Sequence, residues 1–429
     1  MENGLAEVEE VMKRLEKNNK FSDRYGVAPK NETSRLLADM RNLEGSLPDI
    51  ETPKNLDELF ISEAKRRVSG EAFYLEQLLE GAEYSFDQVM KIFGIPQQDI
   101  DELKPWLEQN KEKTEQAIGR LFSKREMAGY ELPLSLDVPN VRRQSEEFAA
   151  ANIHKYHRVI GRFLEGLTNV GEFLRDINAT ATDSDRSYFN TITNTLAISV
   201  PGICFSTEDG TLHLREGELI RIYGHEGMGH ALNSVFTKAQ KLPDFLKTCS
   251  SLAVAAQESV AQFYETRLLI DLKDSLQLQK RLGIEHKFDA IYQEHEDTEQ
   301  LEEYKRKMFQ YGITVLADRA LGEMNDPLTL RRKIDILNQI SLSRIYAVNL
   351  VNKYRYSFDS EGNLDSGLVA ELRYCARPVE RALDEFRKVG IKYEGEGRNK
   401  IDSTLLKGFW TPIGFVEHAR VSAANGNGH

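Results

Sequence analysis

Two histidines five residues apart, His225 and His230, constrain the fold of this chain more than any other feature. They lie in the run Tyr-Gly-His-Glu-Gly-Met-Gly-His-Ala-Leu-Asn (223–233), and Glu226 directly follows the first histidine. An α-helix turns about 100° per residue, so side chains four apart differ in direction by roughly 40° and side chains five apart by roughly 140°. A regular helix would therefore point the two imidazoles away from each other. If they share a metal ion, the helix must accommodate an extra residue.

A helix can accommodate one extra residue as a π-bulge, in which hydrogen bonds join residues five apart, and such bulges collect at functional sites. Gly227 and Gly229 favour this interpretation, because glycine costs about 1 kcal/mol relative to alanine in a regular helix. In the related zinc-protease pattern H-E-x-x-H, both histidines bind zinc and the glutamate is the general base. We therefore predict His225 and His230 as metal ligands and Glu226 as the base. Two surface or capping histidines are the alternative.

A third ligand is needed, because catalytic zinc usually has three protein ligands and one position open to water. The segment 250–265 predicts a helix that begins with a serine cap and carries small apolar residues. Glu258 lies in its middle, and a lone buried carboxylate is costly unless a positive group neutralises it. We predict Glu258 as the third ligand, with a place on a polar stripe beside Gln257 and Gln262 as the alternative. Glu265 is a second candidate, as a ligand or as a hydrogen-bond acceptor for a ligand histidine.

The H-E-x-x-x-H run followed by Glu258 resembles the gluzincin-type zinc metallopeptidases. Its H-E-x-x-G-H form is similar to the dipeptidyl peptidase III family, and the Gly-His-Ala-Leu run at 229–232 resembles the thimet oligopeptidase and carboxypeptidase Taq families. A shifted second histidine is also typical of the tubulin tyrosine carboxypeptidases. The resemblance covers residues 190–270, and it departs from dipeptidyl peptidase III at Gln257, where that family has a second acidic residue. It implies bound Zn²⁺ and a zincin-like helical fold.

Composition narrows the class of partner. The net charge of −12 argues against nucleic acid or an anionic membrane as the main partner. No run approaches 18 apolar residues, and the N-terminus lacks the basic and apolar regions of a signal peptide. The three cysteines, Cys204, Cys249 and Cys375, predict neither a disulfide framework nor a cysteine zinc site. A reducing, cytoplasmic location fits them best.

Hydrophobic periodicity predicts a mainly α-helical fold with one small β-sheet beside the active-site helix. Helices are expected over Leu5–Asn18, Leu56–Glu80, Ile100–Arg125 and Glu146–Asp176, and again over Thr266–Leu282, Thr298–Leu316, Pro327–Lys353 and Asp365–Lys388. Residues 179–186 read as a loop by composition, and strands follow over Thr195–Val200, Gly202–Ser206 and Thr211–Leu214, with a turn at 208–210. We divide the chain into an N-terminal helical region (1–185), a catalytic region (186–422) and a disordered tail (423–429).

A sheet directly before a metal-binding helix suggests a substrate role, because an exposed edge strand can pair with an extended peptide. A packing hairpin without substrate contact is the equal alternative. Helical oligopeptidases carry tyrosines that stabilise the oxyanion about 120 to 130 residues after the motif, and this resemblance makes Tyr346 and Tyr354 catalytic candidates. Buried core tyrosines are the common alternative.

Two arginines and a late histidine complete the candidates. Arg373, or else Arg377, offers a planar guanidinium that could bind a substrate carboxylate through two hydrogen bonds, although a surface ion pair is the ordinary role. His418 is a further candidate oxyanion donor. A cationic clamp of this kind would favour a carboxypeptidase over an endopeptidase, and the sequence leaves that choice open.

Together these features predict a zinc metallopeptidase that acts on a peptide or a protein tail. A Zn²⁺-activated water would attack the peptide carbonyl, with Glu226 as general base. Two alternatives belong to other classes: a metal-dependent hydrolase or lyase acting on a non-peptide metabolite, and a non-catalytic helical binding protein with a vestigial site.

Overall fold

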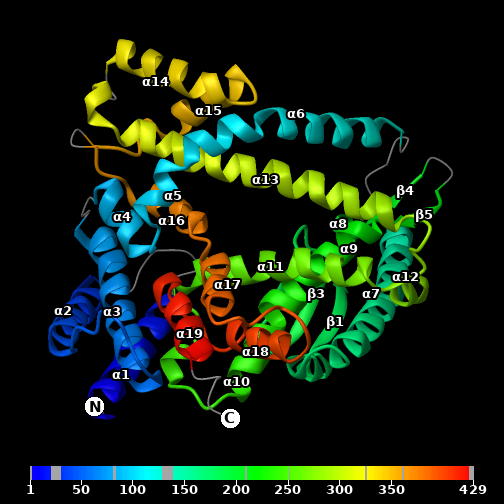
Figure 1. Cartoon of the computed structure of the whole chain (residues 1–429), viewed down its shortest axis with the longest axis horizontal. Helices are drawn as coiled ribbons and strands as arrows, with labels where there is room; N and C mark the ends of the chain where they lie inside the picture. Colours follow the sequence, from blue (N-terminus) through cyan, green and yellow to red (C-terminus); the bar gives the residue numbers. More distant parts are fainter. Residues whose placement is uncertain are drawn as a thin grey trace.

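The computed structural model describes residues 2–20, 30–80, 84–127, 139–207, 210–250, 252–323, 326–359 and 362–424. Most of these residues are helical, and a small mixed sheet lies beside the helices that carry the histidines (Figure 1). The prediction of a mainly α fold is confirmed. No helix among the described residues has the length and apolar character that crossing a membrane requires.

The described residues of the first half of the chain are mainly helical up to residue 176. Its elements are α1 (Glu2–Lys20), α2 (Lys30–Ser46), α3 (Leu56–Glu80), α4 (Phe86–Ile92), α5 (Gln97–Asp101), α6 (Leu103–Met127), α7 (Pro139–Glu165) and the 3-10 helix η1 (Asn169–Asp176). The predicted bounds of α3 are confirmed. The helix predicted from Ile100 is divided at Glu102 into α5 and α6, and the helix predicted up to Asp176 ends at Glu165.

The small sheet has three strands, β1 (Asn178–Thr182), β2 (Tyr188–Asn190) and β3 (Thr195–Ser199). Their order is β1-β3-β2, with β1 parallel and β2 antiparallel to β3. The loop predicted over 179–186 is therefore wrong for its first four residues, which belong to β1. Their composition favours a turn, but pairing with β3 satisfies their backbone groups, and such tertiary pairing overrides weak local preference.

A separate hairpin joins β4 (Cys204–Ser206) to β5 (Leu212–Leu214). The strand predicted to reach Val200 ends one residue earlier, because the Ser199 hydroxyl accepts a hydrogen bond from the Gly202 N–H and caps the short helix α8 (Val200–Ile203). The predicted turn at 208–210 lies mostly outside the described residues, since the description ends at Thr207 and resumes at Gly210.

The described residues from Glu216 onward are again mainly helical. Its elements are α9 (Glu216–Ile222), the π-helix η2 (Tyr223–Leu232), α10 (Asn233–Ala239), η3 (Asp244–Leu246), α11 (Ala253–Lys273), α12 (Leu276–Leu282), α13 (Phe288–Ala317), η4 (Arg319–Leu321), α14 (Pro327–Ile340), α15 (Arg344–Tyr354), α16 (Ser366–Leu372), η5 (Arg373–Cys375), α17 (Pro378–Lys388), α18 (Gly395–Leu405) and α19 (Pro412–Ala424). The helix predicted over Pro327–Lys353 is interrupted, because the Ser343 hydroxyl accepts the Tyr346 N–H and begins α15.

Helix α11 occupies the middle of the molecule (Figure 1). It packs against η2, and α9, α12, α13, α17 and α19 also contact it. One apolar cluster surrounds η2, α10 and α11 and includes side chains from α1–α3 and α17–α19. A second joins α6, α13, α15 and α16. The first cluster crosses the predicted division at residue 185, and that division stays a prediction. The predicted tail starts inside α19, and its residues 425–429 lie outside the description.

Candidate metal centre

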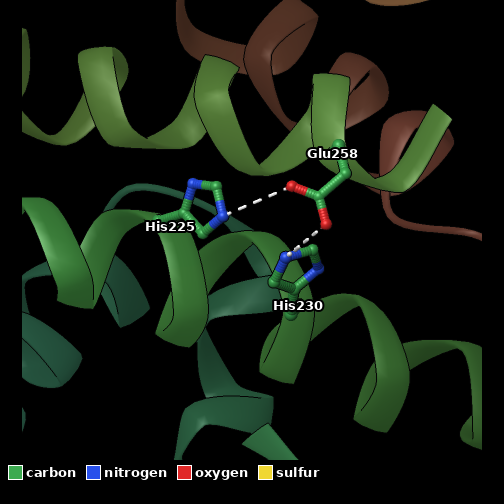
Figure 2. Close-up of side chains that lie close together, drawn as sticks. All are labelled: His225, His230 and Glu258. Atoms are coloured by element: carbon green, nitrogen blue, oxygen red, sulfur yellow. Dashed lines mark ion pairs between the residues drawn. The ribbon is translucent and has the colours of Figure 1, made fainter. Parts of the chain in front are cut away.

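The two histidines project from η2, which is π-helical over ten residues. This confirms the predicted insertion and shows it to be longer than the single turn expected from the sequence. Hydrogen bonds between residues five apart return side chains at that spacing to one face. The imidazole rings of His225 and His230 accordingly stand edge to face, with their centroids 5.0 Å apart (Figure 2).

Glu258 comes from α11 and lies between the two imidazoles (Figure 2). Its Oε2 is 3.6 Å from Nε2 of His225, and its Oε1 is 3.5 Å from Nε2 of His230. Two donors that each lie about 2.1 Å from a tetrahedral ion are about 3.4 Å apart, so this spacing fits Zn²⁺. The three side chains are 18–30% exposed. Partial exposure leaves an open side for a water molecule.

A further carboxylate holds the first histidine in place. The buried Glu265, two turns after Glu258, lies with its Oε2 3.2 Å from Nδ1 of His225. Its Oε1 accepts a hydrogen bond from Arg221 at 3.3 Å, and Arg221 also donates two hydrogen bonds to Glu218. An acceptor at Nδ1 keeps the proton there and leaves Nε2 free to coordinate. The geometry therefore favours the second of the two roles considered for Glu265.

Close packing of η2 on α11 depends on two glycines. A Cβ added to Gly229 would lie 2.3 Å from the Cα of Ala261, and one added to Gly224 would lie 2.8 Å from the Cα of Glu265. The sequence drew attention to Gly229 as a helix irregularity and as part of the Gly-His-Ala-Leu run, and it gave no role to Gly224. The available signal was the five-residue interval between them, which equals the hydrogen-bond spacing of the π-helix.

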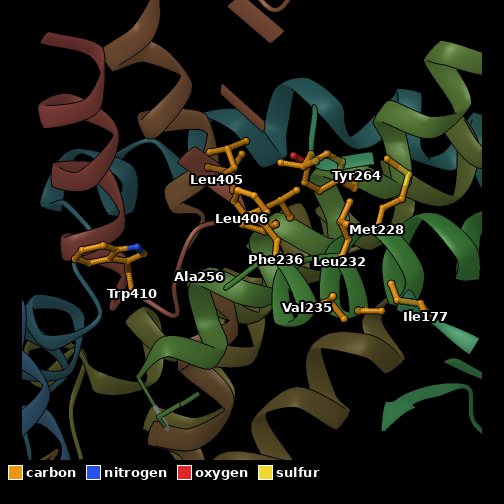
Figure 3. Packing of buried hydrophobic residues seen from close by; sticks show 14 of the residues in the cluster. Ile177, Met228, Leu232, Val235, Phe236, Ala256, Tyr264, Leu405, Leu406 and Trp410 are labelled. Atoms are coloured by element: carbon orange, nitrogen blue, oxygen red, sulfur yellow. The ribbon is translucent and has the colours of Figure 1, made fainter. Parts of the chain in front are cut away.

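Apolar side chains of η2 anchor the helix in the core. Met228 and Leu232 are buried there with Val235 and Phe236 of α10, and Tyr264 of α11 belongs to the same cluster (Figure 3). Burying these side chains fixes the rotation of η2, because exposing them would forfeit about 1.5–3 kcal/mol for each large apolar group. The two histidines are thereby directed toward α11.

The protonation of the centre follows from burial and from neighbouring charges. Burial alone would lower the pKa of His225, but hydrogen bonds with Glu258 and Glu265 raise it to about 9. Burial lowers the pKa of His230 to about 4. Burial raises the pKa of Glu226 to about 7, and the charge of Glu258 adds to that effect. Without an ion, a proton on His225 therefore balances the negative charge of Glu258. A bound metal cation would supply that positive charge instead.

The two candidate tyrosines lie in or against the second apolar cluster, and His418 lies elsewhere. Tyr354 is buried, and its hydroxyl accepts a hydrogen bond from Lys353 at 2.6 Å and donates one to Glu371. Tyr346 packs against the same cluster. His418 is buried in α19 and stacks on Trp410 with ring centroids 4.5 Å apart. The structure thus gives all three side chains packing partners, and their catalytic roles stay predictions.

Arg373, the predicted substrate-binding residue, affects the candidate centre through its charge, which acts on Glu258. It lies in η5, which packs against α11, and one of its amino groups is 2.8 Å from the hydroxyl of Tyr374. Burial raises the pKa of Glu258, but a hydrogen bond from His225 and the positive charges of both histidines and Arg373 outweigh it and lower that pKa. For Arg377, burial lowers the guanidinium pKa.

A cavity of about 500 Å³ lies on another face of α11. Phe263, Thr266, Arg267 and Ile270 of α11 line it together with residues of α17 and α18 and of the segment between them. None of the three predicted metal ligands lines this cavity. It is therefore separate from the candidate metal centre.

Comparison with known proteins adds no family assignment. Neither a protein-family model, nor a curated protein, nor a solved structure matches this chain.

Proposed function

We propose that this protein is a zinc-dependent peptidase whose metal ligands are His225, His230 and Glu258. The observation that carries the proposal is that the carboxylate of Glu258 lies 3.6 Å from Nε2 of His225 and 3.5 Å from Nε2 of His230. The π-helix η2 brings the two histidines onto the face where this is possible. Glu226 adjoins the first ligand, as the general base of zinc peptidases does. The resemblance to gluzincin metallopeptidases supports the same conclusion.

Catalysis divides between the ion and the chain. Bound Zn²⁺ would polarise the substrate carbonyl and lower the pKa of water. Glu226 accepts the proton of the attacking water as a general base and delivers it to the leaving amine as a general acid. Glu265 orients His225 through the hydrogen bond at Nδ1. No nucleophilic side chain is required.

The substrate in this proposal is a peptide or an exposed protein tail, encountered in the cytoplasm. Strand β2 contacts η2 and stands at the edge of the sheet, with β3 as its partner among the described strands. An extended peptide can add to such an edge through main-chain hydrogen bonds. Arg373, whose charge acts on Glu258, supplies a cation for a terminal carboxylate, which favours cleavage at the C-terminal end.

The variant Glu226→Gln tests the proposal. We expect it to retain Zn²⁺ and to lose peptide hydrolysis by roughly 10²–10⁴-fold, the usual contribution of a general base. Glu294→Gln, which changes an exposed carboxylate of α13, is the control and should behave like the wild type. Unchanged turnover in Glu226→Gln would remove the assigned role.

The same assay separates the alternatives. Peptides with free and with blocked C-termini are offered to the zinc-loaded protein, with a chelator-treated sample beside it. Cleavage of the free form alone supports a carboxypeptidase, and cleavage of both supports an endopeptidase. If neither is cleaved by a zinc-loaded protein, a non-peptide metabolite becomes the better hypothesis. If the protein does not retain zinc, the remaining hypothesis is a binding protein with a vestigial site.

A further inference from the structure

A second group of possible metal ligands lies between α11 and α13, adjacent to the candidate metal centre. His295 and Glu299 stand one turn apart on α13, and Glu265 faces them from α11. One donor atom from each of the three side chains lies within 4.8 Å of the other two. Glu265 is 3% exposed and His295 is 7% exposed, so the group is largely shielded from water.

His295 shows that the group is chemically incomplete. Its Nε2 is 3.3 Å from the hydroxyl of Thr266, but its buried Nδ1 has no hydrogen-bond partner among the described residues. A buried polar atom without a partner costs about 1–3 kcal/mol, and such atoms call for a specific explanation. A neutral imidazole nitrogen is a common ligand for divalent transition metals.

The charges around the group also favour the binding of a cation. Glu265 and Glu299 are two carboxylates at close range, and like charges in a buried place repel each other. Arg221 reaches Glu265, but it shares its hydrogen bonds with Glu218. The charge of Arg377 also acts on Glu299, without a hydrogen bond between them. A divalent ion would neutralise both carboxylates together.

We propose that Glu265, His295 and Glu299 form a second site for a divalent transition-metal ion such as Zn²⁺ or Mn²⁺. One nitrogen and two carboxylate oxygens make up the mixed donor set that these ions accept. Glu265 joins the two sites, because its Oε2 also accepts the hydrogen bond from Nδ1 of His225. The site exists independently of the proposed peptidase activity, and only this link between the two ions rests on it.

Zinc stoichiometry tests the proposal. The full chain is equilibrated with Zn²⁺ by dialysis, and bound zinc is measured per chain for the wild type and for Glu299→Gln, Glu258→Gln, the double variant and Glu294→Gln. We expect two ions in the wild type and in Glu294→Gln, one in each of Glu299→Gln and Glu258→Gln, and none in the double variant. Circular dichroism and the unfolding temperature verify that every variant is folded.

The two sites fail in distinguishable ways. One ion in the wild type that Glu299→Gln retains and Glu258→Gln loses would overturn the second site and leave the first intact. The cluster would then be a group of side chains that share a proton. One ion that Glu299→Gln loses and Glu258→Gln retains would support the second site and overturn the first. If Glu299→Gln is unfolded, His295→Gln replaces it in the same comparison.

Discussion

Glu265 offers one carboxylate oxygen to each of two neighbours. Its Oε2 accepts from His225 and its Oε1 accepts from Arg221, at 3.2 and 3.3 Å. A charged acceptor at Nδ1 makes the imidazole a stronger base at Nε2 and fixes the direction of the ring. The side chain is 3% exposed, so solvent does little to weaken this effect. At the scale of single residues, the proposed metal affinity would therefore depend on a carboxylate that need not touch the first ion.

Replacing this carboxylate should weaken the metal centre without removing a ligand. We expect Glu265→Gln to lower the Zn²⁺ affinity of the first site by roughly 10–100-fold. A chelator competition titration measures it, performed in the Glu299→Gln background so that the second site does not contribute. Glu218→Gln is the matched control, because it removes a partner of Arg221 and leaves His225 untouched. An equal loss in both variants would assign the effect to Arg221 instead.

At the scale of elements, the site is a contact between η2 and α11. The π-helical hydrogen bonding brings His225 and His230 onto one face, and the glycines of η2 bring that face against the backbone of α11. Glu258 reaches both histidines only at this short separation. A larger side chain at the contact would push apart the two elements that carry the proposed ligands.

Gly229→Ala should therefore damage stability and metal binding together. The added Cβ would lie 2.3 Å from the Cα of Ala261, and backbone there cannot move aside easily. We expect the free energy of unfolding to fall by about 1–3 kcal/mol, as for overpacked cores, and the zinc content to fall with it. Denaturant titration and metal analysis provide the two measurements.

Gly161→Ala supplies the comparison. Gly161 lies within α7, and a Cβ added there meets nothing within 4 Å. Alanine should stabilise the protein at that position by about 0.4–1 kcal/mol, because it restricts the unfolded chain. If Gly229→Ala were equally well tolerated, the close approach of η2 to α11 would not determine the geometry of the site.

At the scale of the whole molecule, the last helices of the chain close over α11. Arg398 of α18 makes two hydrogen bonds to Asp271 of α11, at 2.9 and 2.7 Å. Asp402, one turn later, accepts a hydrogen bond from Tyr264 at 2.7 Å. These groups are almost fully buried. The helix that carries Glu258 is thus positioned by residues about 130 positions further along the chain.

Breaking this buried pair should destabilise the whole molecule. We expect Arg398→Met to lower the free energy of unfolding by about 3–5 kcal/mol, because it leaves the carboxylate of Asp271 without its main partner. The double variant with Asp271→Asn should lose less than the sum of the single losses. Arg387→Met, in an exposed pair with Asp384, should change little. Additive losses in the double variant would show that the two residues do not stabilise each other.

Features that depend on residues close together in the chain were predictable from the sequence. The interval between His225 and His230 required a π-helix, because hydrogen bonding over five residues is a local property. Glu258 stood out because a lone carboxylate in an apolar helical stretch is costly to bury without a positive partner, and Glu265 was the second candidate because it lies two turns further along. Helix α3 had the predicted bounds because its apolar residues recur at helical spacing.

Features that depend on distant segments were decided only by the tertiary structure. Nothing near residues 178–182 indicates that they pair with β3, and nothing near His295 and Glu299 indicates that α13 faces Glu265. The need for Gly224 becomes visible only when α11 lies against it. The physical reason is that periodicity is encoded within a few residues, whereas the packing of one helix on another is a property of all the apolar surface that the chain buries at once.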